Sequence, residues 1–333
     1  MEDRIDYMEA IASSNKEQLF SNMLRLRYGD TPTFLNLSQI IAGYTVAREA
    51  NAAVLPFAVT GTGGTGASIG GSTRFENRPT ATYTPLTGDK FFRNLLRPIP
   101  PHSVFFVLHA GWPLDTTMTL TIQEMNGISN TVGIGLTRRS PEPEFIELIR
   151  LLTKLQRARA MEIRTSETGD DESKLALRTV LWLEAEDLPQ DVREAIAELR
   201  ALLKLDPDAT EFELVYGRVA TKPNQIVVMT RSILQILATL GAEIDVPEEH
   251  VDSGRTLPTI QTSQDTGANT LSVKWGSEAP ADAFVVTDYK GYRVWIDDTD
   301  FRSKRIFTFV SILFALAGRG ETTETPVLTI PAR

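Results

Sequence analysis

The densest group of side chains that could do chemistry is a set of three aspartates near the C-terminal end, Asp297, Asp298 and Asp300. They follow the segment 292–296, whose alternation of side chains is typical of a strand. Calcium and magnesium bind carboxylate oxygens, so the three aspartates could hold such a cation. Acidic residues here would also cap a following helix and face the positive end of its dipole. We expect capping and keep the metal site as the alternative.

The sequence contains three histidines, His102, His109 and His250. His109 ends the apolar run 104–108, and we expect it in the core or at its boundary rather than acting as a general base. His250 follows two glutamates, a trio that could bind a metal. No two histidines stand at the spacing of ligands on one helix, so we interpret residues 247–250 as a solvated acidic turn.

Two short catalytic or nucleotide-binding patterns overlap in one glycine-rich stretch. Residues 61–66, GTGGTG, match the dinucleotide pattern G-x-G-x-x-G, which needs a helix to open on its third glycine so that backbone amides meet the phosphates. Residues 66–70, GASIG, match a nucleophile elbow around Ser68, which also needs a helix after it. The Gly- and Ser-rich residues 67–73 contradict both, and no Gly-Lys-Ser/Thr follows for a P-loop. We therefore assign no cofactor and no catalytic residue.

The surrounding segment, residues 45–83, is rich in threonine and small residues. Its six clustered glycines are Gly61, Gly63, Gly64, Gly66, Gly70 and Gly71. We interpret the segment as two extended arms around a glycine tip. Such a hairpin can add to the sheet of a neighbouring subunit or close a ring of subunits, and we expect these glycines to mark an assembly hairpin. A flexible surface hairpin with no partner is the alternative.

Composition limits the classes of function. A net charge of −9 argues against a nucleic-acid partner, because such partners are bound mainly through lysine and arginine. The absence of cysteine excludes disulfides, thiolate nucleophiles, Cys-ligated zinc and iron–sulfur clusters. The longest apolar stretch, residues 306–317, is too short for a membrane span of about 20 residues and predicts a buried helix.

We expect an α+β fold of about two domains, residues 1–139 and 140–333, because the 333 residues exceed one average domain and the segment 131–139 resembles a linker. In the C-terminal half, hairpins alternate with amphipathic helices, which favours antiparallel or mixed sheets. The predicted helices cover residues 13–28, 89–96, 140–159, 189–205, 232–240 and 306–317. The predicted strands cover residues 34–44, 161–167, 175–183, 211–218, 225–229, 283–287, 292–296 and 326–330.

Local signals set several of the predicted helix ends. Ser13 or Ser14 can cap the first helix, and Gly29 ends it. Ser140, followed by proline and glutamate, starts another helix. Gly241 closes the helix that begins after Ser232. Residues 116–122 fit either a strand or a helix.

Four blocks spread over most of the chain, residues 22–32, 78–86, 232–237 and 296–305, resemble an uncharacterised family of bacterial proteins. Many of its members are regarded as envelope lipoproteins. The resemblance implies a place in the cell envelope, periplasm or outer membrane, with peripheral or lipid-anchored membrane association. It implies no activity, cofactor or catalytic residue. Residues 1–10, MEDRIDYMEA, lack the pattern of a signal peptide, so the envelope is expected if a signal has been removed and the cytoplasm otherwise.

These observations favour a non-enzymatic structural or assembly protein of the bacterial cell envelope. We expect it to form a homo-oligomer or to bind other envelope proteins through the hairpin at 45–83. The alternative is a hydrolase or metal-dependent enzyme that uses Asp297, Asp298 and Asp300, or Ser68 with a histidine.

Overall fold

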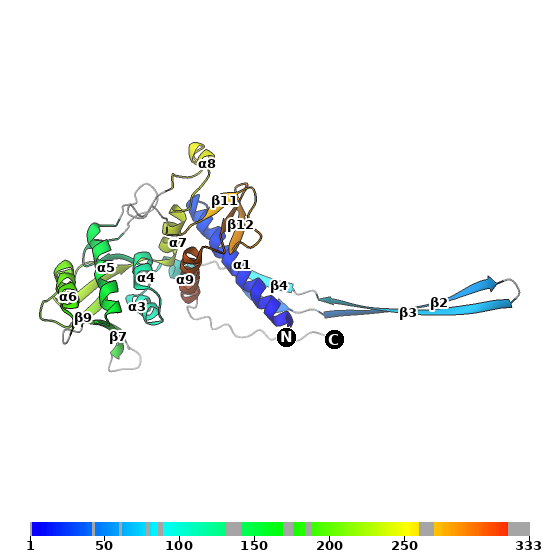
Figure 1. Cartoon of the computed structure of the whole chain (residues 1–333), viewed down its shortest axis with the longest axis horizontal. Coiled ribbons are helices and arrows are strands. Elements are labelled where there is room, and N and C mark those ends of the chain that lie inside the picture. The colour runs from blue at the N-terminus through cyan, green and yellow to red at the C-terminus, as the bar shows by residue number, and fades with distance from the viewer. Residues whose placement is uncertain are drawn as a thin grey trace. The chain divides into compact units, whose positions relative to one another are not determined.

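The structure is a computed structural model that describes residues 2–41, 44–59, 62–77, 80–85, 89–130, 141–168, 176–183, 188–259 and 270–318. Within these ranges the predicted α+β fold is confirmed: helices pack with a mixed six-stranded sheet and an antiparallel three-stranded sheet (Figure 1). The chain clusters into two compact units, unit 1 (Met1–Pro32 and Thr87–Arg333) and unit 2 (Thr33–Leu86).

The six-stranded sheet of unit 1 has the order β6-β5-β10-β9-β8-β7. Its strands are β5 (Ile122–Met125), β6 (Ile128–Ser129), β7 (Met161–Thr168), β8 (Ala176–Leu183), β9 (Glu211–Tyr216) and β10 (Gln225–Thr230). Neighbours are antiparallel except for β9 and β10, which run parallel although only residues 217–224 join them. This short connection turns back beside β9, where the Glu213 N–H donates to the Asn224 carbonyl over 2.9 Å.

Four helices pack on this sheet, α3 (Pro101–His109), α4 (Leu114–Thr121), α5 (Pro143–Arg157) and α6 (Gln190–Leu203). One apolar cluster lies between these helices and the sheet. It contains buried Phe105, Leu152 and Leu203 from the helices and Leu214 and Ile226 from β9 and β10. Nearly every residue of β10 is buried because this strand has a neighbour on each side and covered faces.

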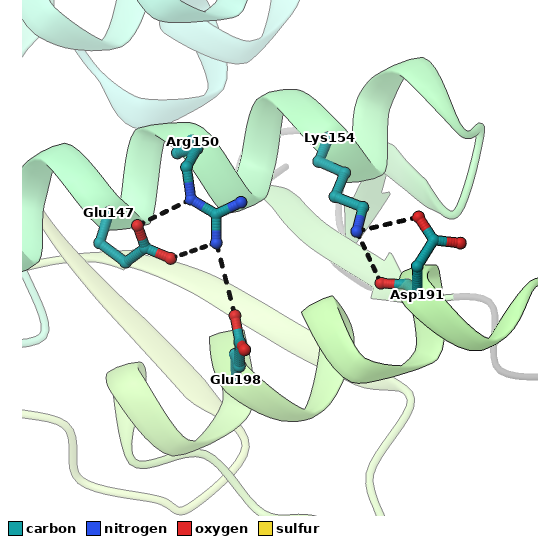
Figure 2. A network of polar contacts seen from close by, with 5 residues as sticks. All are labelled: Glu147, Arg150, Lys154, Asp191 and Glu198. Atoms are coloured by element: carbon teal, nitrogen blue, oxygen red, sulfur yellow. Dashed lines mark hydrogen bonds and ion pairs between the residues drawn. The ribbon is translucent and has the colours of Figure 1, made fainter.

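Figure 2 shows the ion pairs that cross between α5 and α6 on the surface. Arg150 donates two hydrogen bonds to Glu147 and lies 3.5 Å from a Glu198 carboxylate oxygen, while Lys154 Nζ lies 3.0 Å from Asp191 Oδ2. The hydrogen bond from Arg150 lowers the pKa of Glu147. Because the Arg150 and Glu147 side chains are 55% and 42% exposed, the pair contributes little to stability.

The rest of unit 1 is built around a second group of helices. They are α1 (Glu2–Arg27), α2 (Asp89–Leu96), α7 (Ile233–Ala242), the short α8 (Glu248–Asp252) and α9 (Phe301–Gly318). The three-stranded sheet, β11 (Lys274–Gly276), β13 (Tyr292–Ile296) and β12 (Val285–Tyr289), packs with them. The ring of Phe307 on α9 packs edge-to-face with the rings of Phe20 and Phe284, at centroid distances of 6.2 and 5.8 Å. These contacts tie α1 and the sheet to α9.

Gly241 does not close α7 as predicted but lies inside it, one residue before the helix ends. A side chain there would place its Cβ 2.9 Å from the Met23 backbone oxygen of α1. The glycine is thus needed for the close approach of two helix backbones. Gly29, by contrast, has a φ of 72° two residues after the end of α1, which confirms the predicted helix end.

Two predicted helix starts are wrong. The first helix begins at Glu2, so Ser13 and Ser14 lie within it, and the Ser13 hydroxyl donates to the side chain of Glu17, one turn later. The α5 helix begins at Pro143 with Glu142 as its N-cap, so the second proline of the segment takes the first helical position. The ambiguous residues 116–122 form most of α4 and the start of β5.

Unit 2 contains two antiparallel pairs, β1 (Leu35–Ile41) with β4 (Thr80–Pro85) and β2 (Tyr44–Val59) with β3 (Thr62–Asn77). The boundaries of the two units differ from the domain boundary predicted after residue 139. Strands β5 and β6 precede that residue, yet they share a sheet with β10, which follows it. The predicted strand at 326–330 and the predicted linker at 131–139 lie outside the described residues.

Candidate functional site

The predicted hairpin of unit 2 is a long two-stranded ribbon, which we call the β2–β3 hairpin (Figure 1). Its strands have 16 residues each and pair without a break from Tyr44 opposite Asn77 to Val59 opposite Thr62. At about 3.3 Å per residue, each strand is about 50 Å long. The mean strand of a globular protein has only about 5–6 residues, so β2 and β3 are each more than twice the usual length.

The register corrects the expectation of a glycine tip. Five of the six glycines lie within β3, and only Gly61, which is outside the described residues, falls between the strands. Their partners on β2 are Ala58, Phe57, Leu55, Asn51 and Ala50, opposite Gly63, Gly64, Gly66, Gly70 and Gly71. Glycine weakens a strand and often marks a place where another backbone approaches closely. The glycines therefore lie along β3 rather than at a turn.

The two outer edges of the hairpin differ. Residues of an antiparallel pair alternate between hydrogen-bonded pairs and pairs whose N–H and C=O groups point away from the partner strand. Pro56, opposite Thr65, has no N–H, so it fits only where its nitrogen points outward. By the same alternation Ala52 points its backbone groups outward on β2, and Ala67 does so on β3. Proline thus interrupts the outer edge of β2, whereas β3 contains no proline.

Charge is also distributed unevenly along the hairpin. Its two cations and two carboxylates, Arg48, Glu49, Arg74 and Glu76, all lie in the part nearer to Tyr44 and Asn77. Residues 50–70 contain no charged side chain. Proteins that keep exposed sheet edges apart place charges or prolines on them. The edge of β3 lacks this protection over most of its length.

The three aspartates that could have formed a metal site are each bound to different groups. Asp300 caps α9, because its Oδ1 accepts from the Ser303 N–H (3.0 Å) and its Oδ2 from the Ser303 hydroxyl (2.6 Å). Asp298 accepts from Lys304 Nζ over 2.5 Å. Asp297 accepts from Lys274, and this hydrogen bond lowers the pKa of Asp297. Capping is confirmed for Asp300.

Metal-ligating side chains gather nowhere in groups of three or more among the residues that the structure describes. His109 is exposed at the end of α3 rather than in the core, with its Nε2 2.6 Å from the Ile163 carbonyl oxygen. His102 lies at the other end of α3, and burial lowers its pKa. The side chain of Ser68 is outside the described part of the structure, so the serine–histidine alternative stays a prediction.

The interpretation of residues 247–250 as a solvated turn is wrong. They begin α8, and His250 is only 1% exposed. The Nδ1 of His250 lies 2.7 Å from the Tyr28 hydroxyl, and the imidazole ring makes T-shaped contacts with the rings of Tyr28 and Tyr292. Its Nε2 is buried without a hydrogen bond, 3.6 Å from Glu249. No local pattern could have revealed this, because Tyr28 is 222 residues away.

Further polar contacts surround this histidine. The Tyr289 hydroxyl donates to Asp30 over 2.5 Å, and Lys290 Nζ lies 2.9 Å from the same carboxylate. These two groups, the tyrosine first, lower the pKa of Asp30. The Tyr292 hydroxyl donates to Glu249 over 2.8 Å. Together the contacts fasten the end of α1 to the β12–β13 turn and to α8, which is a structural role.

No protein-family model matches the chain, and no match was found among the curated proteins or the solved structures.

Proposed function

We propose that the protein is a non-enzymatic structural or assembly protein of the bacterial cell envelope and that it forms homo-oligomers through the β2–β3 hairpin. The observation that carries this proposal is the edge of β3, which runs for 16 residues with no proline and has no charge between residues 62 and 71. Other envelope proteins are the second kind of partner for the same edge.

The energetics of an isolated hairpin support a partner. A two-stranded ribbon is marginally stable in water, and a third strand would satisfy the outward N–H and C=O groups of β3. Two copies of β3 can pair antiparallel across a two-fold axis, which makes the contact self-complementary. The small residues of β3 would let the two backbones and their side chains approach closely.

The envelope location rests on the four blocks that resemble bacterial envelope lipoproteins. In the part of the chain that the structure describes, we find no helix that is both long enough and apolar enough to span a bilayer. Peripheral or lipid-anchored association is the form of membrane attachment that we propose, because the resemblance to envelope lipoproteins implies it. The alternative of a hydrolase or metal-dependent enzyme is supported by none of the contacts among the described residues.

A matched pair of proline substitutions tests the assembly edge. Ala67→Pro removes an outward N–H from β3, and Ala52→Pro removes one from β2, while neither costs the hairpin one of its own ladder bonds. We expect the unmodified protein to have a mass by light scattering that is a multiple of 36.9 kDa. Ala67→Pro should shift it towards the monomer, and Ala52→Pro should not. A monomeric unmodified protein would contradict assembly, and equal effects of both prolines would contradict the choice of edge.

A shortened hairpin tests the whole segment. Replacing residues 54–67 by Asn-Gly keeps the pairs from Tyr44 opposite Asn77 to Ala53 opposite Ser68 and closes them with a favoured two-residue turn. We expect this variant to be monomeric, with a thermal unfolding transition of unit 1 like that of the unmodified protein. Persistence of the full oligomer would show that the interface lies elsewhere.

A further inference from the structure

A hollow of about 280 Å³ lies between α4 and α9 in unit 1. We call it the α4–α9 hollow. Polar side chains dominate its lining, namely Asp115, Thr116 and Thr119 from α4, Thr270, and Arg302 and Arg305 from α9. It holds more positive than negative charge, although the whole chain has a net charge of −9.

The two arginines differ from the other polar residues in the first turns of α9. Ser303 binds Asp300 and Lys304 binds Asp298, so the two carboxylates next to the start of α9 are already engaged. Arg302 and Arg305 make no hydrogen bond or ion pair within the described residues. The Nε of Arg305 is moreover shielded from solvent without an acceptor. This Nε is closed to a ligand, so the terminal nitrogens of the two guanidinium groups are the donors that remain without a partner among the described residues.

We propose that the α4–α9 hollow binds inorganic phosphate. Guanidinium groups donate paired hydrogen bonds to the oxygens of a phosphate, and two arginines at i and i+3 on one helix can do so from neighbouring turns. The hydroxyls of Thr119 and Thr270 can donate to the remaining oxygens.

Asp115 determines which oxyanion the hollow accepts. Its Oδ1 accepts from the Thr116 N–H over 2.7 Å, and an ionised carboxylate can only accept hydrogen bonds. A ligand beside it must therefore supply a proton. Hydrogen phosphate carries one at neutral pH, whereas sulfate carries none and the dianion of a phosphate monoester has lost its own above a pKa of about 6. The hollow should thus prefer inorganic phosphate to both.

Calorimetric titration of the full chain at pH 7.5 tests this preference. We expect inorganic phosphate to bind, with sulfate and methyl phosphate, which have no proton to donate at this pH, weaker by about tenfold, the change that one charge-assisted hydrogen bond makes. Arg305→Gln should weaken phosphate binding by about tenfold or more. Arg150→Gln, which removes an equal charge outside the hollow, should leave it unchanged. Absence of phosphate binding, or equal losses in both variants, would overturn the proposal.

Asp115→Asn provides a second test of the proposal, which does not depend on whether the arginine variant folds. An amide can donate as well as accept, so sulfate should then bind about as tightly as phosphate. Asp115 is exposed, and the substitution should leave the thermal transition of the protein in place. If sulfate already equals phosphate in the unmodified protein, Asp115 does not select the ligand and the assignment to inorganic phosphate fails. Neither test depends on the state of the β2–β3 hairpin.

Discussion

The contact between α1 and α7 depends on the missing side chain of Gly241, and Gly241→Ala should therefore destabilise the protein. The new Cβ would lie 2.9 Å from the Met23 carbonyl oxygen and 3.6 Å from the Arg27 nitrogen, both of which are backbone atoms. A flexible side chain could move away at little cost, but a helix backbone cannot. The α7 helix must shift as a whole.

Two opposing terms set the size of the effect. Alanine is favoured over glycine within a helix by about 1 kcal/mol. Inserting a methyl group into a closely packed core costs about 1–3 kcal/mol. The side chains of Met23 and Leu237 beside this contact are fully buried, so α1 and α7 have little room to relax. We expect the upper part of the range to apply and a net loss of about 1–2 kcal/mol in the free energy of unfolding.

Denaturant unfolding followed by circular dichroism measures this loss. Ala242→Gly is the matched control, because it changes helix propensity at the next residue of α7, which is half-buried. If propensity alone governed this region, Gly241→Ala would stabilise the protein and Ala242→Gly would destabilise it. A Gly241→Ala protein as stable as the unmodified one would refute the backbone contact as the reason for the glycine.

Three further predictions concern unit 1. Burial lowers the pKa of His102, so the unfolded chain binds more protons than the folded protein below about pH 6.5. The free energy of unfolding should therefore fall as the pH is lowered through this range. Denaturant unfolding measured across pH should show a shallower fall in His102→Gln. The pKa of Asp30 is lowered chiefly by the hydrogen bond from Tyr289, so its contribution is present above about pH 4 and lost as the pH falls through the folded-state pKa. Asp30→Asn should remove this acid dependence, and an unchanged acid profile would argue against the pair. Ser232→Ala removes a capping box with Gln235 and should lower the free energy of unfolding in urea by about 1 kcal/mol. An unchanged free energy of unfolding would show that the cap does not stabilise α7.

The features that could be predicted from the sequence have local causes. The long hairpin follows from extended small residues, and the end of α1 follows from Gly29, which adopts the left-handed conformation that glycine permits. Asp300 as a helix cap follows from its place between a strand and an apolar run. Each of these depends on neighbours within a few positions of the chain.

The features that could not be predicted depend on distant partners. The sequence around Gly241 fits both a glycine that ends a helix and a glycine that lets two helices cross closely. The Met23 backbone oxygen, which a Cβ at this position would approach to 2.9 Å, distinguishes the two cases. His250 is flanked by charge and proline, yet Tyr28 and Tyr292 bury it. The glycines looked like a tip because their composition does not reveal the register. Only the pairing of Val59 with Thr62 places them on one strand.

The register of the hairpin also restricts how its length can evolve. A two-residue connection closes on a hydrogen-bonded pair, and such pairs recur at every second position of the ladder. Removing one residue from each arm would put the wrong kind of pair at the end, and removing one from a single arm would exchange the two faces of that strand. Descendants that keep the same connection should therefore differ from this chain in steps of four residues, two from each arm.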